Sequence, residues 1–114
     1  MIFDELSFHD ARILEVKEDT ATQTLDFVLY FPVDWENNKF EKKVLRFKDA
    51  IVYVKKEILF AGCPTIMEVK EQHSHKHTYT FADGITVSSK YKIKIETNAG
   101  DRFVEFNEAE LLDV

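Results

Sequence analysis

The sequence predicts a mainly β fold, an antiparallel sheet arranged as a sandwich or half-barrel with at most two short helices. Apolar and polar residues alternate along residues 25–31 and 91–96, and a period of two places every second side chain on one face of a sheet. The chain also has ten Phe residues, which fill a sheet core without a polar atom to satisfy. Its 114 residues suit one β domain over residues 1–114.

The first three predicted strands follow this alternation. Residues 8–18 and 24–32 form a hairpin across the polar turn between them, and residues 40–48 form the third strand. Pro32 has no N–H group to give to a neighbouring strand, so it should end the second strand or lie at an edge.

Residues 49–62 fit two structures. Asp49 can begin a helix and Gly62 can end one. Against a helix stands the run 51–54, which is β-branched and aromatic. A strand over 50–56 is preferred because its neighbours are strands, and the alternative is an α+β fold with a helix near residues 49–61.

The rest of the chain predicts further strands. Residues 65–72 form one, an Asp-Gly turn at 83–84 follows, and residues 85–87 add strand material. A closing hairpin joins 91–97 to 102–106. Residues 107–112 begin with a helix-capping Asn and acidic residues, which indicates one helical turn or a tail.

Charge and composition exclude several classes of protein. The net charge of −6 disfavours nucleic acid and favours a basic protein partner. The single cysteine, Cys63, cannot form an internal disulfide and is expected to be a buried or partly buried, inert thiol. The first six residues do not resemble a secretory signal and no apolar run is long enough to span a membrane. We therefore expect a cytoplasmic protein that binds no membrane.

The histidines His73, His75 and His77 form the one unusual cluster. On a strand they would line one face with Cα atoms about 6–7 Å apart, which suits zinc, copper or nickel. Glu71 could assist such a metal. The alternative is a solvated hairpin tip, and because no fourth ligand or supporting group is evident, we expect no bound metal or other cofactor.

Candidate contacts to a partner are the acids Glu105, Glu108 and Glu110, near the C-terminus with Asp113, and the aromatic Trp35. The acids alternatively form a solvated face, and Trp35 is either a core residue or an exposed anchor. His9 and Asp10 would point to opposite faces of a strand, so they should not form a catalytic pair with each other, and His9 is expected to be structural. No nucleophile, phosphate loop or Cys-pair zinc motif is evident.

The segment Phe8-His9-Asp10-Ala11, followed by residues 12–16 and an acidic turn into 25–27, resembles the opening of several families of small, mostly uncharacterised bacterial β proteins. Some of these are grouped with immunity proteins of polymorphic toxin systems. Residues 45–47 and 104–106 are similar in style. The resemblance implies a stoichiometric binder without enzymatic activity whose partner is a protein such as a toxin. It indicates no particular toxin and no contact residues, and the 73–77 cluster has no counterpart in it.

Three functions follow as hypotheses. The first is a non-enzymatic, immunity-like module that masks a protein partner through an acidic and aromatic surface. The second is a zinc-binding protein or metal-dependent enzyme built on His73, His75 and His77. The third is a homo-oligomer in which an exposed strand edge pairs with another copy.

Overall fold

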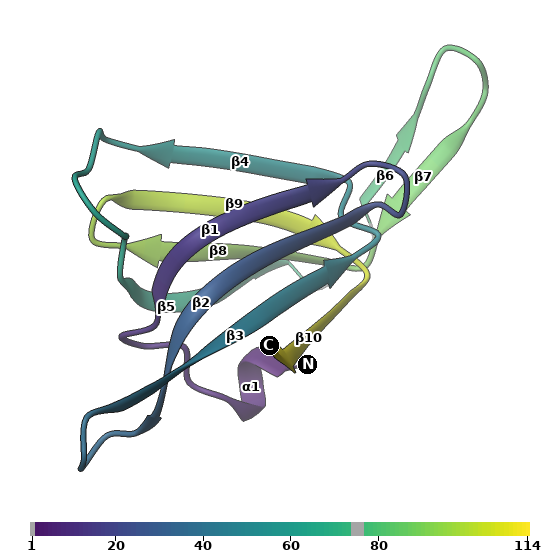
Figure 1. The fold of residues 1–114 in the computed structure, drawn as a ribbon. Coiled ribbons are helices and arrows are strands. Elements are labelled where there is room, and N and C mark those ends of the chain that lie inside the picture. Colours follow the sequence, from purple (N-terminus) through teal and green to yellow (C-terminus); the bar gives the residue numbers. More distant parts are fainter. Residues whose placement is uncertain (1, 74–76) are drawn as a thin grey trace.

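The computed structural model describes residues 2–73 and 77–114, without the side chains of residues 73 and 77, and these residues form mainly antiparallel β structure (Figure 1). The elements are, in chain order, α1 (Ile2–Glu5), β1 (Arg12–Asp19), β2 (Thr24–Asp34), β3 (Lys39–Lys48), β4 (Val52–Glu57), β5 (Ile66–His73), β6 (His77–Thr80), β7 (Thr86–Ser89), β8 (Tyr91–Thr97), β9 (Gly100–Phe106) and β10 (Glu108–Asp113).

Two four-stranded sheets face each other, and a hairpin projects from them. The first sheet has the order β1-β2-β3-β10, the second has the order β4-β9-β8-β5, and β6 pairs with β7. Figure 1 shows the β6–β7 hairpin extending away from the sheets. The mainly β, antiparallel class predicted from the period of two is therefore confirmed.

The two sheets are connected at a shared corner. β3 pairs with β10 in the first sheet, and their chain neighbours β4 and β9 pair in the second. The chain passes between the sheets at this place twice, through Asp49 between β3 and β4 and through Asn107 between β9 and β10. Asp49 has a positive φ of 53°, and the Asn107 N–H donates to the Lys48 carbonyl at 3.1 Å. Asp tolerates this left-handed conformation better than most residues, which explains an acid at the bend.

The core lies between the sheets and consists of the alternate residues of their inner faces. Phe27, Phe47 and Phe106 have no exposed surface. The Phe47 ring packs on Phe106 with centroids 4.8 Å apart and on Phe27 at 5.6 Å. Phe3 of α1 lies against Phe47 and Phe106. The helix thus covers the core with one aromatic side chain.

The preferred prediction for residues 49–62 is confirmed and the helical alternative is wrong. Residues 52–57 form β4, and each of them pairs with β9 without a register shift. Pro32 lies inside β2, which continues to Asp34 through a bulge. Pro32 lies beyond Tyr30, the last β2 residue that pairs with β1. At Pro32, β2 therefore pairs with β3 alone.

Two local predictions are wrong. Residues 108–113 form strand β10, not a helical turn or a tail, because they pair along β3 from Lys48 to Lys43. The first strand begins at Arg12 rather than at residue 8. Residues 9 and 10 form a turn, with φ of 69° at Asp10, so the strand argument that kept His9 and Asp10 apart does not apply to them.

Candidate partner-binding surface

The β2–β3 turn presents Trp35 to solvent. Trp35 is 53% exposed, so the alternative that places it in the core is wrong, and its role as an anchor for a partner stays a prediction. Asp34 holds the turn: its carboxylate accepts hydrogen bonds from the Asn37 N–H at 3.3 Å and from the Asn37 side-chain amide at 2.6 Å. These bonds lower the pKa of Asp34 below its usual value. The turn closes as the Asn38 N–H donates to the Trp35 carbonyl at 3.3 Å.

His9 connects Trp35 to the start of β5. Its ring stacks on the Trp35 ring, with centroids 6.0 Å apart and an interplanar angle of 13°. Its Nδ1 lies 2.8 Å from the Met67 carbonyl oxygen, and its Nε2 lies 3.5 Å from Asp10 Oδ1. His9 and Asp10 therefore do not point to opposite faces as expected, whereas the expectation that they form no catalytic pair stays a prediction. His9 holds segments far apart in the sequence together, as the structural assignment expected, and also forms part of an exposed surface.

A hollow of about 360 Å³ lies beside His9. Two large apolar side chains on its wall are exposed, Leu6 by 41% and Met67 by 55%. The residues that line the hollow come from α1, the turn after it and the start of β5: Phe3, Asp4, Glu5, Leu6, Ser7, Phe8, His9, Met67, Glu68 and Val69. We name Trp35, together with these hollow residues, the Trp35 surface.

The Trp35 surface is acidic. Asp4, Glu5 and Glu68 line the hollow, and no Lys or Arg is among its lining residues. Lys70 approaches Glu68 to 3.7 Å, but its shorter contact is to Glu96 at 2.9 Å. The hollow thus combines exposed apolar side chains with acidic ones.

The contacts of His9 are those of a residue that holds segments of the fold together. Within the described residues, the two His9 ring nitrogens contact a backbone carbonyl and a carboxylate. A nucleophilic mechanism needs a Ser, Cys or Thr in hydrogen-bond contact with the base. The nearby Ser7 hydroxyl instead accepts the His9 backbone N–H at 3.4 Å.

The acids that the sequence predicted as partner contacts, Glu105, Glu108 and Glu110, do not line the Trp35 surface. Glu105 is 4% exposed, and Tyr79 donates its hydroxyl to both Glu105 carboxylate oxygens at 2.9 Å. Glu105 therefore anchors the hairpin and offers no surface acid to a partner. Glu108 and Glu110 lie on β10 and approach Lys48 at 4.0 and 3.2 Å, which offsets part of their charge.

Two further site predictions concern His and Cys residues. His75 and the side chains of His73 and His77 lie outside the described residues, so the metal site stays a prediction. Among the residues that are described, no group of three or more His, Cys, Asp or Glu side chains could hold a metal ion. Cys63 is exposed, so the expectation of a buried or partly buried thiol is wrong: its loop lies between β4 and β5 and outside both sheets.

Sequence reasoning missed a charged cluster between the sheets. Arg102 is 4% exposed and donates two hydrogen bonds to the Glu57 carboxylate. It also donates to the Tyr53 hydroxyl at 3.2 Å and lies over the Phe27 ring. Burial favours a neutral Glu57, but the bonds and charge of Arg102, with help from Lys55 and Thr97, lower the Glu57 pKa overall. The sequence signal was available, since Arg102 is in phase with the core residues Val104 and Phe106.

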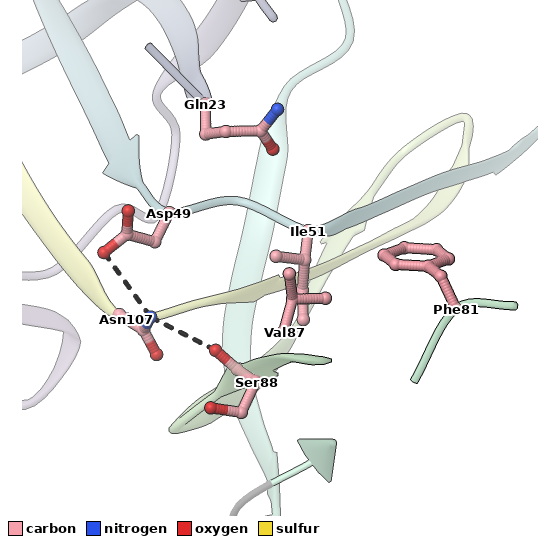
Figure 2. A pocket seen from close by; sticks show the side chains of 7 residues that line it. All are labelled: Gln23, Asp49, Ile51, Phe81, Val87, Ser88 and Asn107. Atoms are coloured by element: carbon pink, nitrogen blue, oxygen red, sulfur yellow. Dashed lines mark hydrogen bonds between the residues drawn. The ribbon is translucent and has the colours of Figure 1, made fainter. Parts of the chain in front are cut away.

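A second hollow, of about 480 Å³, opens at the corner between the sheets. Figure 2 shows Asn107 bridging its wall. The Asn107 amide donates to the Asp49 carboxylate at 3.4 Å and to the Ser88 carbonyl at 3.2 Å. The remaining lining residues are Gln23 and the apolar Ile51, Phe81 and Val87. We name this hollow the corner pocket.

Comparisons of the chain with protein-family models, with curated proteins and with solved structures find no match. Within residues 2–73 and 77–114, no helix is both long enough and apolar enough to cross a membrane. The functional argument therefore depends on the geometry of the surfaces themselves.

Proposed function

We propose that this protein is a non-enzymatic binding module that captures a basic protein partner on the Trp35 surface. The observation that carries the proposal is an exposed Trp35, stacked on His9 beside an acid-lined hollow. Trp is enriched among the residues that dominate interface energies. The turn and ring contacts hold Trp35 before a partner arrives, which reduces the entropy lost on binding.

The charge of the protein supports a basic partner. The net charge of −6 and the acids of the hollow would accelerate association and select against acidic proteins. Most of this benefit acts over a distance, so it should decline as salt screens the charges.

The immunity-like resemblance supports a toxin as the partner. Two of the four residues that carry the resemblance, Phe8 and His9, also line this surface, and Asp10 and Ala11 follow them directly, Asp10 in contact with His9 and Ala11 buried. This segment is apolar at both ends and polar in the middle, and its buried ends anchor the surface to the core.

The test is capture of proteins from the native cell with immobilised wild type, Trp35→Ala and Ile85→Ala. Trp35 and Ile85 are similarly exposed, 53% and 58%, but Ile85 lies in the turn of the β6–β7 hairpin. We expect wild type and Ile85→Ala to retain the same protein and Trp35→Ala to lose it. Retention should weaken between about 50 and 200 mM salt.

The proposal fails if Trp35→Ala retains every captured protein, or if Trp35→Ala and Ile85→Ala lose it equally. Turnover of a small molecule by the purified protein, abolished by a change at His9, would also contradict it.

A further inference from the structure

The most regular free strand edge in the described chain is that of β4. The outer strands of the two sheets are β1, β10, β4 and β5. β1 and β5 carry register shifts, and such bulges protect an edge from pairing. Figure 1 shows α1 beside β10. β4, by contrast, pairs with β9 in unbroken register from Val52 to Glu57.

The backbone of β4 has groups directed toward this edge. In an antiparallel pair, successive residues point their N–H and C=O groups to opposite sides. The Ile58 N–H donates to the Ala99 carbonyl at 3.0 Å, so residues 52, 54 and 56 bond toward β9. Tyr53, Lys55 and Glu57 therefore point their backbone groups away from β9, where a further strand could pair with them.

The two ends of β4 differ in a complementary way. Just after its C-terminal end, Ile58 is 73% exposed and Leu59 fully exposed. Just before its N-terminal end lies the corner pocket, whose apolar lining includes Ile51, Phe81 and Val87 (Figure 2). Exposed apolar side chains thus lie at one end of the edge and an apolar hollow at the other.

From this arrangement we infer that two copies of the protein associate through antiparallel pairing of their β4 strands. A two-fold axis through the middle of β4 brings the Ile58–Phe60 loop of each copy to the corner pocket of the other. Such an isologous contact uses each apolar loop and each pocket once and closes on itself. It extends the second sheet across both copies and does not rest on the proposed Trp35 surface.

Charge selects the register. In an antiparallel pair, residues directly opposite one another have their side chains on the same face of the sheet. The two-fold axis must therefore pass through a residue and not between two, and in the middle of β4 that residue is Val54 or Lys55. An axis through Lys55 would oppose two like charges. With Val54 on the axis, Lys55 of each copy lies opposite Tyr53 of the other and enters the neighbouring hollow that Glu18, Asp19 and Tyr53 help to line. This complementarity identifies the occupant of the edge as a second copy.

The test is sedimentation equilibrium of the full chain over a range of concentrations. We expect a monomer–dimer equilibrium for wild type. Leu59→Asp should raise the dimer dissociation constant on the order of tenfold or more, whereas Val114→Asp, at a position 77% exposed, should leave it unchanged. Lys55→Pro, which removes an edge N–H without touching the bonds to β9, should also abolish the dimer, whereas Lys55→Thr keeps that N–H and should retain most of it.

Circular dichroism of each variant confirms that it is folded before its mass is interpreted. A wild-type protein that stays monomeric at all concentrations overturns the inference. A dimer that persists in both Leu59→Asp and Lys55→Pro overturns it too, because the copies would then associate elsewhere. Failure here leaves capture by the Trp35 surface untouched, since that assay follows a different residue.

Discussion

At the scale of single residues, the Arg102–Glu57 pair is the most consequential contact. Both side chains lie between the sheets, with 5% and 3% of their surface exposed. Bringing two charges out of water is costly, and their mutual bonds offset that cost only while both partners are present. The pair should therefore be needed for the fold as a unit rather than as two separate contributions.

Arg102→Met should lower the free energy of unfolding by about 3–5 kcal/mol, because it leaves Glu57 as a buried charge without its partner. The double variant Arg102→Met/Glu57→Leu should recover a large part of that loss. Urea unfolding of the wild type and the single and double variants measures both values. Equal stability of the single and double variants would show that the pair is not coupled.

The same pair predicts a pH dependence. The Glu57 pKa is lowered from its ordinary 4.5, so the folded state holds this proton less tightly than the unfolded state. Its contribution is complete above the ordinary value and is lost as the pH falls through the lowered folded value. Wild type should thus lose more unfolding free energy between pH 6 and about pH 3 than Glu57→Gln does. Parallel losses in urea titrations of the two proteins would contradict this account.

At the scale of elements, a hydrogen bond between a phenol and a buried carboxylate connects the β6–β7 hairpin to the second sheet. Tyr79 on β6 donates its hydroxyl to the buried Glu105 on β9. This hydrogen bond, together with burial, raises the Tyr79 pKa above its ordinary value. This phenol, together with the Asn107 amide that donates to the Ser88 carbonyl of β7, thus helps to fix where the hairpin leaves the body and, with it, the position of Phe81 at the corner pocket.

Tyr79→Phe should loosen the hairpin while the sheets remain intact. Loss of a hydrogen bond to a charged group costs about 1.5–3 kcal/mol when the group is well buried, and most of that should appear as local opening. Hydrogen exchange should accelerate at residues 78–80 and 86–88 and remain slow in β2 and β8. Uniform acceleration along the whole chain would contradict a local role for this bond.

The period of two predicted most of the strands because each sheet buries one face. Alternation in residues 25–31 and 91–97 is a direct record of that burial, and β4 was found because β-branched residues outweigh the capping signals around it. β10 was missed because its burial is only partial and its acids are typical of a helix start. Pairing with β3, which is distant in sequence, decides its structure.

The candidate site was less predictable for a related reason. Exposure of Trp35 follows from the length and bonding of its turn, and its contact with His9 joins residues from different turns. Local pattern carries no information on such contacts. Glu105 shows the converse: an acid in an apolar strand was expected at the surface, yet it is buried and accepts a hydrogen bond from a Tyr of another hairpin.

At the scale of the whole molecule, the fold separates two exposed surfaces. Trp35 lies at the β2–β3 turn and the hollow near it is lined by α1, the turn after it and β5, whereas β4 is the opposite edge strand of the sheet that contains β5. A rigid double sheet between them lets one surface bind a partner without remodelling the other. The account therefore expects a binding protein whose affinity depends on one surface and whose assembly depends on the other.

The most direct test of the binding function is calorimetric titration of the purified captured partner into wild type and Trp35→Ala, with unfolding free energies measured alongside. The account predicts that Trp35→Ala raises the dissociation constant by on the order of thirtyfold or more, as loss of an interface anchor does. Its unfolding free energy should stay within about 0.5 kcal/mol of wild type, as for a surface substitution. Equal affinity of the two proteins, with both folded, would contradict the Trp35 surface as the site of binding.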